Sequence, residues 1–406
     1  MIQKRTHLSK PAAIALFIAG ALLLLATEFF RVYLIMPFPG SQNSDTVGLA
    51  WSIDHYRIFL RIAGLLLIAY PFLRLWRGAR IVGKITLGII TAFYCVIFYF
   101  FNFRFEADKM FYQPGHKAFA QAADNKIPLN KLVIGFTSGG EARAYPIQII
   151  GYHHQVRDTV GNLPVMVTYC TVCRTGRVFS PTVNGHAENF RLVGMDHFNA
   201  MFEDATTKSW WQQATGEAVA GPLKETHLSE LPSSQLSLRE WLQQHPDSKI
   251  LQPDTTFQKD YDDLADYDIG TIRGGLEKRD SASWKMKSWV IGVRSGPYAK
   301  AYDWNTLVSH QLIQDTIGAT PIAILLDDDS ASFHTWNRQV KGQTLQFQRI
   351  QGQPLLSDSN TGSQWDAGGL CVSGPLKDQQ LQPIQSYQEF WHSWSHFHPS
   401  TTRYNP

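Results

Sequence analysis

Residues 164–176, Pro-Val-Met-Val-Thr-Tyr-Cys-Thr-Val-Cys-Arg-Thr-Gly, decide how the soluble part of this chain is interpreted. A short apolar run rich in β-branched residues leads to Cys170, Cys173 follows three positions later, and a second apolar run begins near Val178. Two such runs joined by a short segment with Gly are typical of antiparallel strands. The stretch therefore predicts a strand, a tight turn that carries a Cys-x-x-Cys pair, and a returning strand.

The overall composition is that of a large, ordered protein. The chain has 406 residues, of which 44% are hydrophobic and 13% aromatic, and these values exclude disorder. The formal net charge of +3 is small, and no basic patch interleaved with aromatic residues occurs outside the membrane flanks, so we expect no nucleic-acid partner. No P-loop pattern is present, and we expect no nucleotide cofactor.

Three long apolar segments occupy the N-terminal part of the chain, at residues 12–30, 58–75 and 85–101. Each has about the 20 residues that a helix needs to cross the hydrocarbon core. The first is longer than the apolar region of a signal peptide and is not followed by a small-x-small cleavage site. Residues 1–103 are therefore predicted to form a membrane domain of three helices in contact with the lipid bilayer.

The distribution of basic residues predicts the orientation of these spans. Three basic residues precede the first span: Lys4, Arg5 and Lys10. Four more lie at the connection between the second and third spans: Arg74, Arg77, Arg80 and Lys84. The loop at residues 37–50 has none, so the positive-inside rule places the N-terminus in the cytoplasm. Everything after the third span is then periplasmic or extracellular, outside the cell (inner) membrane. Arg57 and Arg61 oppose this rule, and we expect them to snorkel to the interface.

The sequence after residue 103 repeats itself. Val133-Ile-Gly135 recurs 157 residues later as Val290-Ile-Gly292, within a longer set of identities. Residues 204–211 recur at a spacing of 154 as residues 358–365, and residues 221–246 recur at a spacing of 153 as residues 374–399. Many identities with few register shifts indicate a tandem duplication. The predicted fold is a membrane-anchored α+β protein with a β-rich, internally duplicated extracytoplasmic domain.

The boundaries of the two halves and their elements follow from the same pattern. We place the first half at residues 104–256 and the second at residues 257–406, with a charged connection at residues 257–286. Strands are predicted at residues 131–136, 164–169 and 322–326, and short helices that end at His-Pro at residues 236–244 and 386–395. The repeated tryptophans are interpreted as core anchors and not as a sugar-binding surface: Trp211, Trp365, Trp241 and Trp394.

A residue type that occurs in only one half is a better candidate for chemistry than one that both halves share. At the spacing of 157, Cys170 and Cys173 correspond to Asp327 and Ser330. The repeated fold therefore does not require the two thiols. Of the other cysteines, Cys95 lies in the third span as a small apolar residue. Cys371 has no partner if Cys170 and Cys173 pair with each other.

Three interpretations of the Cys-x-x-Cys pair remain open. The pair forms a disulfide, either structural or redox-active. It contributes two thiolates to a metal whose other ligands come from elsewhere. Or one cysteine acts as a nucleophile with a nearby histidine as base. A second Cys-x-x-Cys, which would favour zinc, is absent from the sequence. Arg174 occupies the place of the histidine of a c-type haem-attachment motif. The predicted strand–turn–strand also differs from the strand followed by a helix that carries the cysteines of a thioredoxin-like active site.

His153 and His154 are the candidate partners, because a hairpin-like return of the chain would bring them near the turn. Thiolates with imidazole suit copper or zinc. Met195 and Met201 would add thioethers, although Met is more often a core residue. His153 has a counterpart in His310, which favours a structural role, whereas His154 has none.

Two groups of aspartates have simpler interpretations. Asp158 and Asp315 are each followed by Thr, and they are expected to be turn or capping residues. Residues 327–329, Asp-Asp-Asp, form either a solvated loop or a set of oxygen ligands for a hard cation.

A set of motifs spread over the first half resembles the family called domain of unknown function 3179. The set comprises Ala144-Tyr-Pro146, His153 with Asp158, Val167-Thr-Tyr-Cys170 with Cys173, residues 204–213, residues 216–222, and Trp241 with His245-Pro246. The second half resembles the continuation of that family. Arg157, Thr171-Val172 and Arg174 stand where the family pattern has Asn, Pro-Leu and Gly. The resemblance implies a membrane-linked extracytoplasmic protein of a bacterium or archaeon, and it implies no reaction.

The leading expectation is a membrane-anchored extracytoplasmic protein that binds a transition metal through Cys170 and Cys173, with His153 or His154, for metal handling or a redox step. The alternative is a non-enzymatic accessory subunit of a membrane complex, with a structural disulfide and other subunits as partners. A hydrolase is a third class, without a recognised motif. The sequence assigns no catalytic residue.

Overall fold

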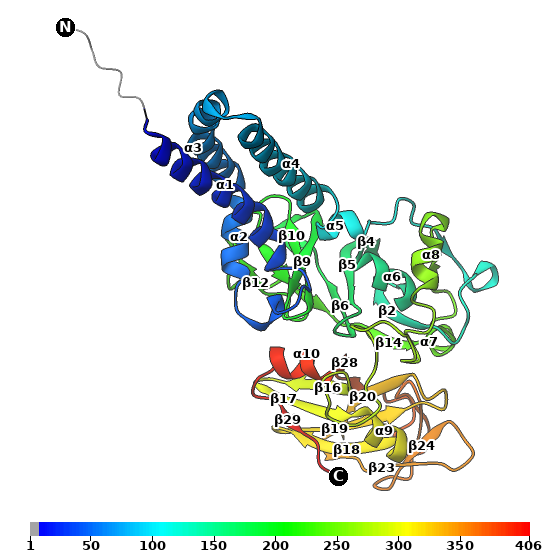
Figure 1. Cartoon of the computed structure of the whole chain (residues 1–406). Coiled ribbons are helices and arrows are strands. Elements are labelled where there is room, and N and C mark those ends of the chain that lie inside the picture. The colour runs from blue at the N-terminus through cyan, green and yellow to red at the C-terminus, as the bar shows by residue number, and fades with distance from the viewer. Residues whose placement is uncertain (1–7) are drawn as a thin grey trace. The chain divides into compact units, whose positions relative to one another are not determined.

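The computed structural model describes residues 8–406, and the chain divides into two compact units (Figure 1). Unit 1 contains the described residues up to Tyr112 together with Phe190–Gln212 and Ala218–Thr226. Unit 2 contains Gln113–Asn189, Gln213–Glu217 and His227–Pro406. A central piece of the chain thus belongs to the unit of the N-terminal helices. This division differs from the three segments predicted from the sequence, at residues 1–103, 104–256 and 257–406.

Unit 1 contains the three predicted apolar helices. Among residues 8–406, α1 (Lys10–Tyr33), α3 (Arg57–Gly78) and α4 (Ile81–Phe103) are long and apolar enough to cross a membrane. The prediction of three such helices is confirmed, and each helix extends beyond its apolar segment into polar flanks. The short helices α2 (Val47–His55) and α5 (Ala107–Met110) and the 3-10 turn η1 (Ser41–Asn43) follow the C-terminal ends of α1 and α4.

The packing of α1 against α3 depends on two glycines. A Cβ atom placed on Gly20 would lie 2.8 Å from the carbonyl oxygen of Gly64. Small residues of this kind allow two helix backbones to approach closely.

Polar side chains join the three helices near one end. Arg61 of α3 donates to both carboxylate oxygens of Glu28 in α1, each at 2.7 Å, and Asn102 of α4 donates to Glu28 at 2.8 Å. Glu28 is fully buried. A buried carboxylate therefore holds the Arg61 guanidinium against α1, and whether Arg61 reaches a membrane interface stays a prediction. Arg57 likewise pairs with Asp54 at 2.6 Å.

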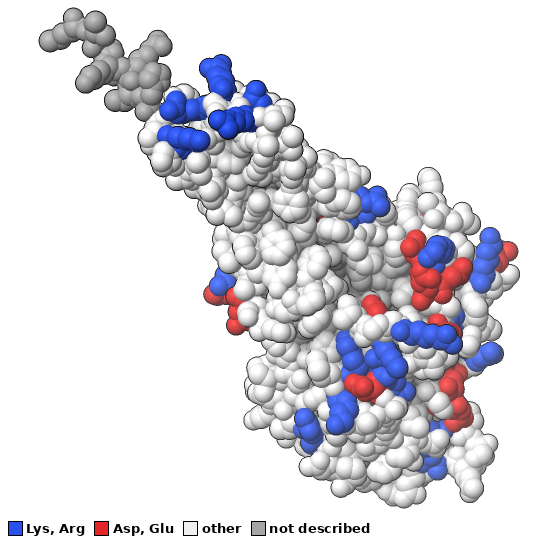
Figure 2. Space-filling view, viewed as in Figure 1, with Lys and Arg blue, Asp and Glu red and all other residues white. Residues whose placement is uncertain are grey.

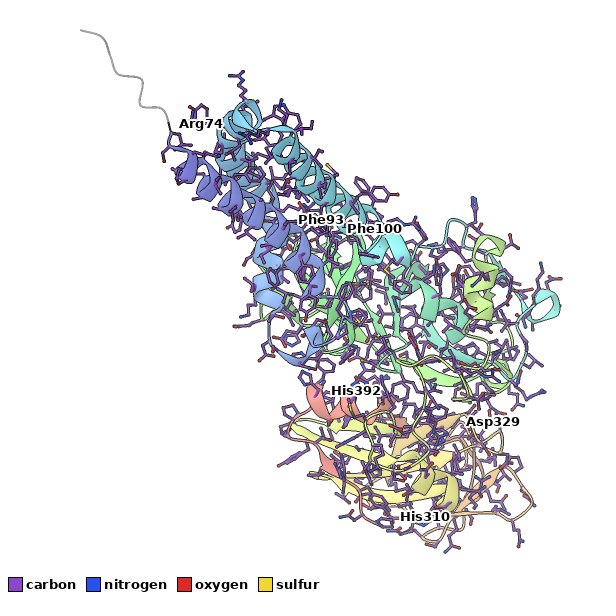
Figure 3. All side chains as sticks on the ribbon, viewed as in Figure 1. Arg74, Phe93, Phe100, His310, Asp329 and His392 are labelled. Atoms are coloured by element: carbon purple, nitrogen blue, oxygen red, sulfur yellow. The ribbon has the colours of Figure 1, made fainter. Side chains whose placement is uncertain are left out.

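Basic side chains gather at the opposite end of the helices, around the connection between α3 and α4 (Figure 2). Arg74, near the end of α3, lies there (Figure 3). The two ends of the bundle therefore differ in charge, as the sequence indicates.

An antiparallel sheet from the middle of the chain completes unit 1. Its strands are β9 (Phe190–Asp196), β10 (Asn199–Asp204), β11 (Trp210–Gln212) and β12 (Ala218–Ala220). Met201 and Trp210 of this sheet share an apolar cluster with Leu34, at the C-terminal end of α1, and Val47 of α2. Met201 is fully buried there, as expected of a core methionine.

The first half of unit 2 has two main sheets. One has the order β1-β15-β3-β2-β14 and the other β13-β6-β5-β4. The elements are β1 (Phe119–Ala120), η2 (Ala122–Asp124), β2 (Leu132–Ser138), β3 (Glu141–Pro146), α6 (Ile147–His153), β4 (Gln155–Val160), β5 (Leu163–Cys170), β6 (Thr175–Phe179), β7 (Thr182–Val183), β8 (His186–Ala187), β13 (Glu230–Leu231), β14 (Ser234–Ser237), α7 (Leu238–Gln244) and β15 (Lys249–Leu251).

The second half follows a segment with η3 (Thr255–Phe257) and α8 (Gln258–Asp262). Its sheets have the orders β28-β16-β17-β29, β18-β19-β20-β27 and β23-β24-β25-β26. The elements are β16 (Trp289–Ser295), β17 (Tyr298–Asp303), α9 (Trp304–His310), β18 (Leu312–Ile317), β19 (Thr320–Leu326), β20 (Phe333–Asn337), β21 (Gln339–Val340), β22 (Gln343–Thr344), β23 (Phe347–Arg349), β24 (Leu355–Asp358), β25 (Gln364–Asp366), β26 (Cys371–Ser373), β27 (Gln382–Pro383), β28 (Ser386–Phe390), α10 (Trp391–Phe397) and β29 (Thr402–Arg403).

The strand orders of the two halves correspond. The order β15-β3-β2-β14 matches β29-β17-β16-β28, including a parallel pair at β15–β3 and at β17–β29. The predicted strands are present as β2, β5 and β19. The helix predicted at residues 236–244 begins at Leu238. The helix predicted at residues 386–395 is wrong in its first part, because Ser386–Phe390 pairs with β16 as a strand and only Trp391–Phe397 is helical.

The repeated tryptophans are buried, as predicted: Trp211, Trp241, Trp365 and Trp394. A Cβ atom on Gly135 would lie 2.2 Å from the Trp241 ring, and one on Gly292 would lie 2.2 Å from the Trp394 ring. Each glycine lies in a strand and makes room for the indole of a short helix that packs on its sheet.

Asp158 and Asp315 do not cap turns, so that expectation is wrong. They lie within strands β4 and β18, where each accepts a hydrogen bond of 2.8 Å from a tyrosine hydroxyl, Tyr145 and Tyr302 respectively. The tyrosines come from β3 and β17, and only tertiary packing brings these strands together.

Candidate functional site

The Cys-x-x-Cys pair lies in the predicted strand–turn–strand. Strand β5 ends at Cys170, which pairs with Thr175 at the start of β6, and residues 171–174 form the turn between them. The prediction for this stretch is confirmed.

Arg174 closes the turn in a conformation that usually needs glycine. Its φ of 55° lies in the left-handed region, which glycine adopts readily and other residues rarely do. The buried guanidinium donates from Nε to Gln388 Oε1 at 2.7 Å and stacks over Trp289 with 3.8 Å to the ring centroid. These contacts offset the cost of the strained backbone.

Cys170 and Cys173 are thiols with no exposed surface. Burial raises the pKa of the Cys173 thiol well above its ordinary value, and the hydrogen-bonded Cys170 side chain raises it further. Ser393 and Lys287 act in the opposite direction without overcoming burial. The Cys173 thiol is therefore neutral at neutral pH, and it lies beside Cys170.

The second half of unit 2 covers the turn. The backbone N–H of Phe390 donates to the Cys173 carbonyl at 2.9 Å. Lys287 Nζ donates to the Val172 carbonyl at 2.6 Å and lies 3.1 Å from His392 Nε2. Burial and the Lys287 charge lower the pKa of His392 to about 4, so its ring is neutral, and its Nε2 also lies 3.2 Å from the Val172 carbonyl. His392 belongs to α10 (Figure 3).

The two candidate histidines lie close to the end of β5 but face different partners. His154 Nδ1 lies 3.0 Å from the Tyr169 carbonyl, and the Tyr169 N–H donates to the His154 carbonyl at 3.0 Å. Burial lowers the pKa of His154 to about 4, so the ring is neutral and Nδ1–H donates. His153 Nε2 lies 2.7 Å from the Tyr261 hydroxyl.

The residues around the turn do not complete a metal centre of the kind that zinc requires. Within residues 8–406, no three or more His, Cys, Asp or Glu side chains are arranged to hold an ion. A structural zinc site uses four such ligands. A copper or zinc cofactor at Cys170 and Cys173 therefore stays a prediction from the sequence.

A buried ion pair fixes the turn to its cover. Arg177 of β6 pairs with Glu389 of β28, and both side chains are almost fully buried. Burial lowers the pKa of Arg177, but Glu389, Tyr387 and Glu230 raise it, and the net shift is upward. The arginine is thus held in its charged form.

Sequence reasoning missed Lys287, His392 and Ser393. A signal for two of them was present, because His392 and Ser393 correspond to Arg239 and Glu240 at the spacing of 153. The test that singled out the cysteines, a difference between the halves, applies to these positions equally.

Comparison with known proteins gives one match. A family model described as "Protein of unknown function (DUF3179)" matches residues 113–401, which span both halves of the repeated region. Neither the curated proteins nor the solved structures contain a match. Since the model covers most of the chain, this protein belongs to the DUF3179 family.

Proposed function

We propose that this protein is anchored in the cell membrane by α1, α3 and α4 and carries a buried dithiol–disulfide pair, Cys170 and Cys173, on the extracytoplasmic side. The observation that carries the proposal is the pairing of two neighbouring, fully buried thiols in one turn.

The helices support the anchor. All three are long and apolar, and in α3 and α4 only 11% and 6% of the residues in the most apolar stretch are buried. Apolar side chains left exposed along whole helices need a lipid environment. The basic connection between α3 and α4 supports a cytoplasmic location for that end, with unit 2 outside.

Electrostatics favour a redox pair over a metal site. A metal binds thiolates, and burial, which raises the pKa of Cys173, makes two thiolates costly. Oxidation avoids this cost, because a disulfide is neutral. Cys170 and Cys173 would each lose a proton and together lose two electrons as the S–S bond forms, and an external disulfide would accept these electrons and protons as two thiols.

Lys287 supports the reactive step. Attack on a disulfide requires a thiolate, and the ammonium group of Lys287 favours that form at Cys173. The cover formed by Phe390 and α10 blocks access in this conformation, so exchange requires the cover to open.

The test is a redox titration of the full-length protein in detergent. The protein is equilibrated in dithiol and disulfide mixtures and then quenched, and its thiols are counted by mass-tag alkylation after unfolding. We expect two of the four cysteines to change together as a two-electron couple. Cys170→Ser or Cys173→Ser should abolish the transition, and the matched variant Cys371→Ser should retain it.

Other outcomes assign other functions. Four reactive thiols at every potential would exclude the redox pair. A disulfide that no reductant opens in the folded protein would indicate a structural bridge and an accessory role. Stoichiometric copper or zinc that is lost in the double serine variant would restore the metal interpretation.

We further propose that the two halves arose by tandem duplication, supported by the corresponding strand orders and by the Gly–Trp contacts. Gly135→Ala and Gly292→Ala should then lower the melting temperature to a similar extent. Gly275, with no atom within 4 Å of an added Cβ, provides the control variant. A large loss at one glycine and none at the other would contradict equivalent packing.

A further inference from the structure

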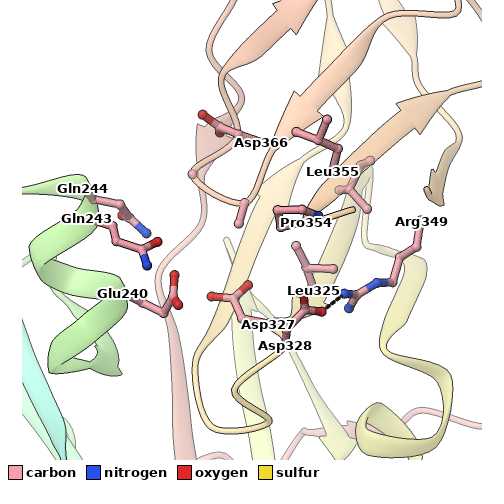
Figure 4. A pocket seen from close by; sticks show the side chains of 13 residues that line it. Glu240, Gln243, Gln244, Leu325, Asp327, Asp328, Arg349, Pro354, Leu355 and Asp366 are labelled. Atoms are coloured by element: carbon pink, nitrogen blue, oxygen red, sulfur yellow. Dashed lines mark hydrogen bonds and ion pairs between the residues drawn. The ribbon is translucent and has the colours of Figure 1, made fainter. Parts of the chain in front are cut away.

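A second candidate site lies in unit 2, in a pocket of about 490 Å³ between α7 and the second half (Figure 4). Helix α7 contributes Glu240, Gln243 and Gln244 to one wall. The opposite wall contains Asp327 and Asp328, which follow β19, and Arg349 of β23. Leu325, Pro354 and Leu355 supply an apolar surface.

Two carboxylates in this pocket form no ion pair with a lysine or arginine of the described residues. Asp327 is 6% exposed, its Oδ2 lies 3.0 Å from His334 Nε2, and its Oδ1 has no hydrogen-bond partner within residues 8–406. The Glu240 carboxylate forms no hydrogen bond or ion pair with the described part of the chain. In Figure 4 the two carboxylates point toward one another.

Burial and neighbouring carboxylates raise the pKa of both groups. Burial raises the pKa of Glu240, and the charges of Asp327 and Asp329 raise it further. Burial also raises the pKa of Asp327. The one arginine of the lining is already engaged, because Arg349 pairs with Asp328 and donates to the Leu326 carbonyl at 2.8 Å.

The pocket occupies the place that corresponds to the thiol site. Asp327 corresponds to Cys170 at the spacing of 157, and Glu240 corresponds to Ser393 at the spacing of 153. In each case the turn after a central strand of one half faces the short helix of the other half. The same framework thus presents thiols at one place and carboxylates at the other.

We propose that this pocket binds an organic ammonium ion, a primary amine on a short aliphatic body, through Glu240 and Asp327. An ammonium group would supply the missing positive charge and hydrogen-bond donors. Leu325, Pro354 and Leu355 suit the aliphatic part, and the volume suits a small molecule. Bare metal ions fit less well, because no three carboxylate, imidazole or thiol groups in residues 8–406 are arranged around one point.

The experiment is isothermal titration of the full-length protein in detergent with putrescine, and with butanediol as a neutral ligand of similar length. We expect one putrescine per chain and no binding of the diol. Glu240→Gln and Asp327→Asn should each weaken binding by about tenfold or more. Asp247→Asn, which removes an exposed carboxylate just beyond α7 and outside the pocket, should have no effect.

Melting temperatures separate lost binding from lost folding. Glu240→Gln and Asp327→Asn relieve carboxylate repulsion and should melt no lower than the parent protein. Equal binding of the diol, unchanged putrescine affinity in both variants, or competition by calcium at equimolar concentration would overturn the proposal. Cys170→Ser should leave putrescine binding unchanged, so this test is independent of the redox titration.

Discussion

Gln235 in β14 donates from Nε2 to Oε1 of Gln388 in β28 at 3.1 Å, and both side chains are buried. The two residues are 153 positions apart, which is the spacing at which residues 221–246 recur. A residue that contacts its own counterpart is expected where two similar units meet about a local twofold axis. Near this contact, α10 covers the thiol turn, and α7 faces Asp327 across the pocket.

The ion pair between Arg177 and Glu389 should be essential for stability. Arg177→Met leaves a buried carboxylate without a cation and should lower the free energy of unfolding by about 3–5 kcal/mol. Denaturation of the detergent-solubilised protein measures the change. Arg143→Met, at the more exposed pair with Glu141, is the matched control and should cost less than about 1 kcal/mol.

The double variant Arg177→Met with Glu389→Leu tests the cause of that loss. It removes both charges and should recover most of the stability, because no uncompensated charge remains. A double variant as unstable as the single one would show that packing around Arg177, and not its charge, is what matters.

Lys287 should accelerate oxidation of the thiol pair. Lys287→Met removes the cation that favours the Cys173 thiolate, and the rate of disulfide formation should fall by about tenfold. The rate is followed by quenched alkylation after addition of oxidised glutathione. Lys285→Met, at an exposed site two residues away, should react at the parental rate. Equal rates in both variants would remove Lys287 from the mechanism.

His154 should make the fold sensitive to acid. Its pKa is lowered from 6.5 to about 4 by burial, so the unfolded chain binds a proton that the folded chain does not. The contribution to stability is complete above pH 6.5 and is lost as the pH falls toward about 4. The loss is at most roughly 3 kcal/mol.

Thermal unfolding across that pH range measures this contribution. His154→Asn should reduce the acid-induced loss, because Asn tolerates the left-handed backbone at this position and does not titrate. The exposed His186→Asn is the control and should follow the parent protein. An unchanged acid profile in His154→Asn would assign the sensitivity to other groups, such as His392.

Arg61 should hold the apolar helices together. Arg61→Met leaves Glu28 buried without its bidentate partner and should destabilise the detergent-solubilised protein by about 3–5 kcal/mol. Arg57→Met, at a half-exposed pair with Asp54, should cost less than about 1 kcal/mol. Similar melting temperatures for both variants would contradict a structural role for the Glu28–Arg61 pair.

Local patterns predicted much of the fold. The apolar segments of α1, α3 and α4 and the alternation around Cys170 are properties of neighbouring residues, so they are legible in the sequence. The error at residues 386–395 has a physical cause. Ser386–Phe390 becomes a strand because it pairs with β16, nearly 100 residues earlier in the chain, and such pairing overrides local preference.

The thiol site was only partly predictable. The sequence identified Cys170, Cys173 and the approach of His154, because a hairpin places residues on adjacent strands opposite one another. It did not identify Lys287 or Ser393, which reach the turn from more than 100 residues away.

The sequence by itself determined the apolar helices, the Cys-x-x-Cys turn and the repeat spacing, since each depends on residue types at fixed short or regular intervals. Only the tertiary structure decided that the thiols are buried, that the second half covers them, and that Glu240 faces Asp327. The physical reason is that burial and charge pairing arise from contacts between distant segments. Such contacts lower the free energy of the folded chain without leaving a pattern in either segment alone.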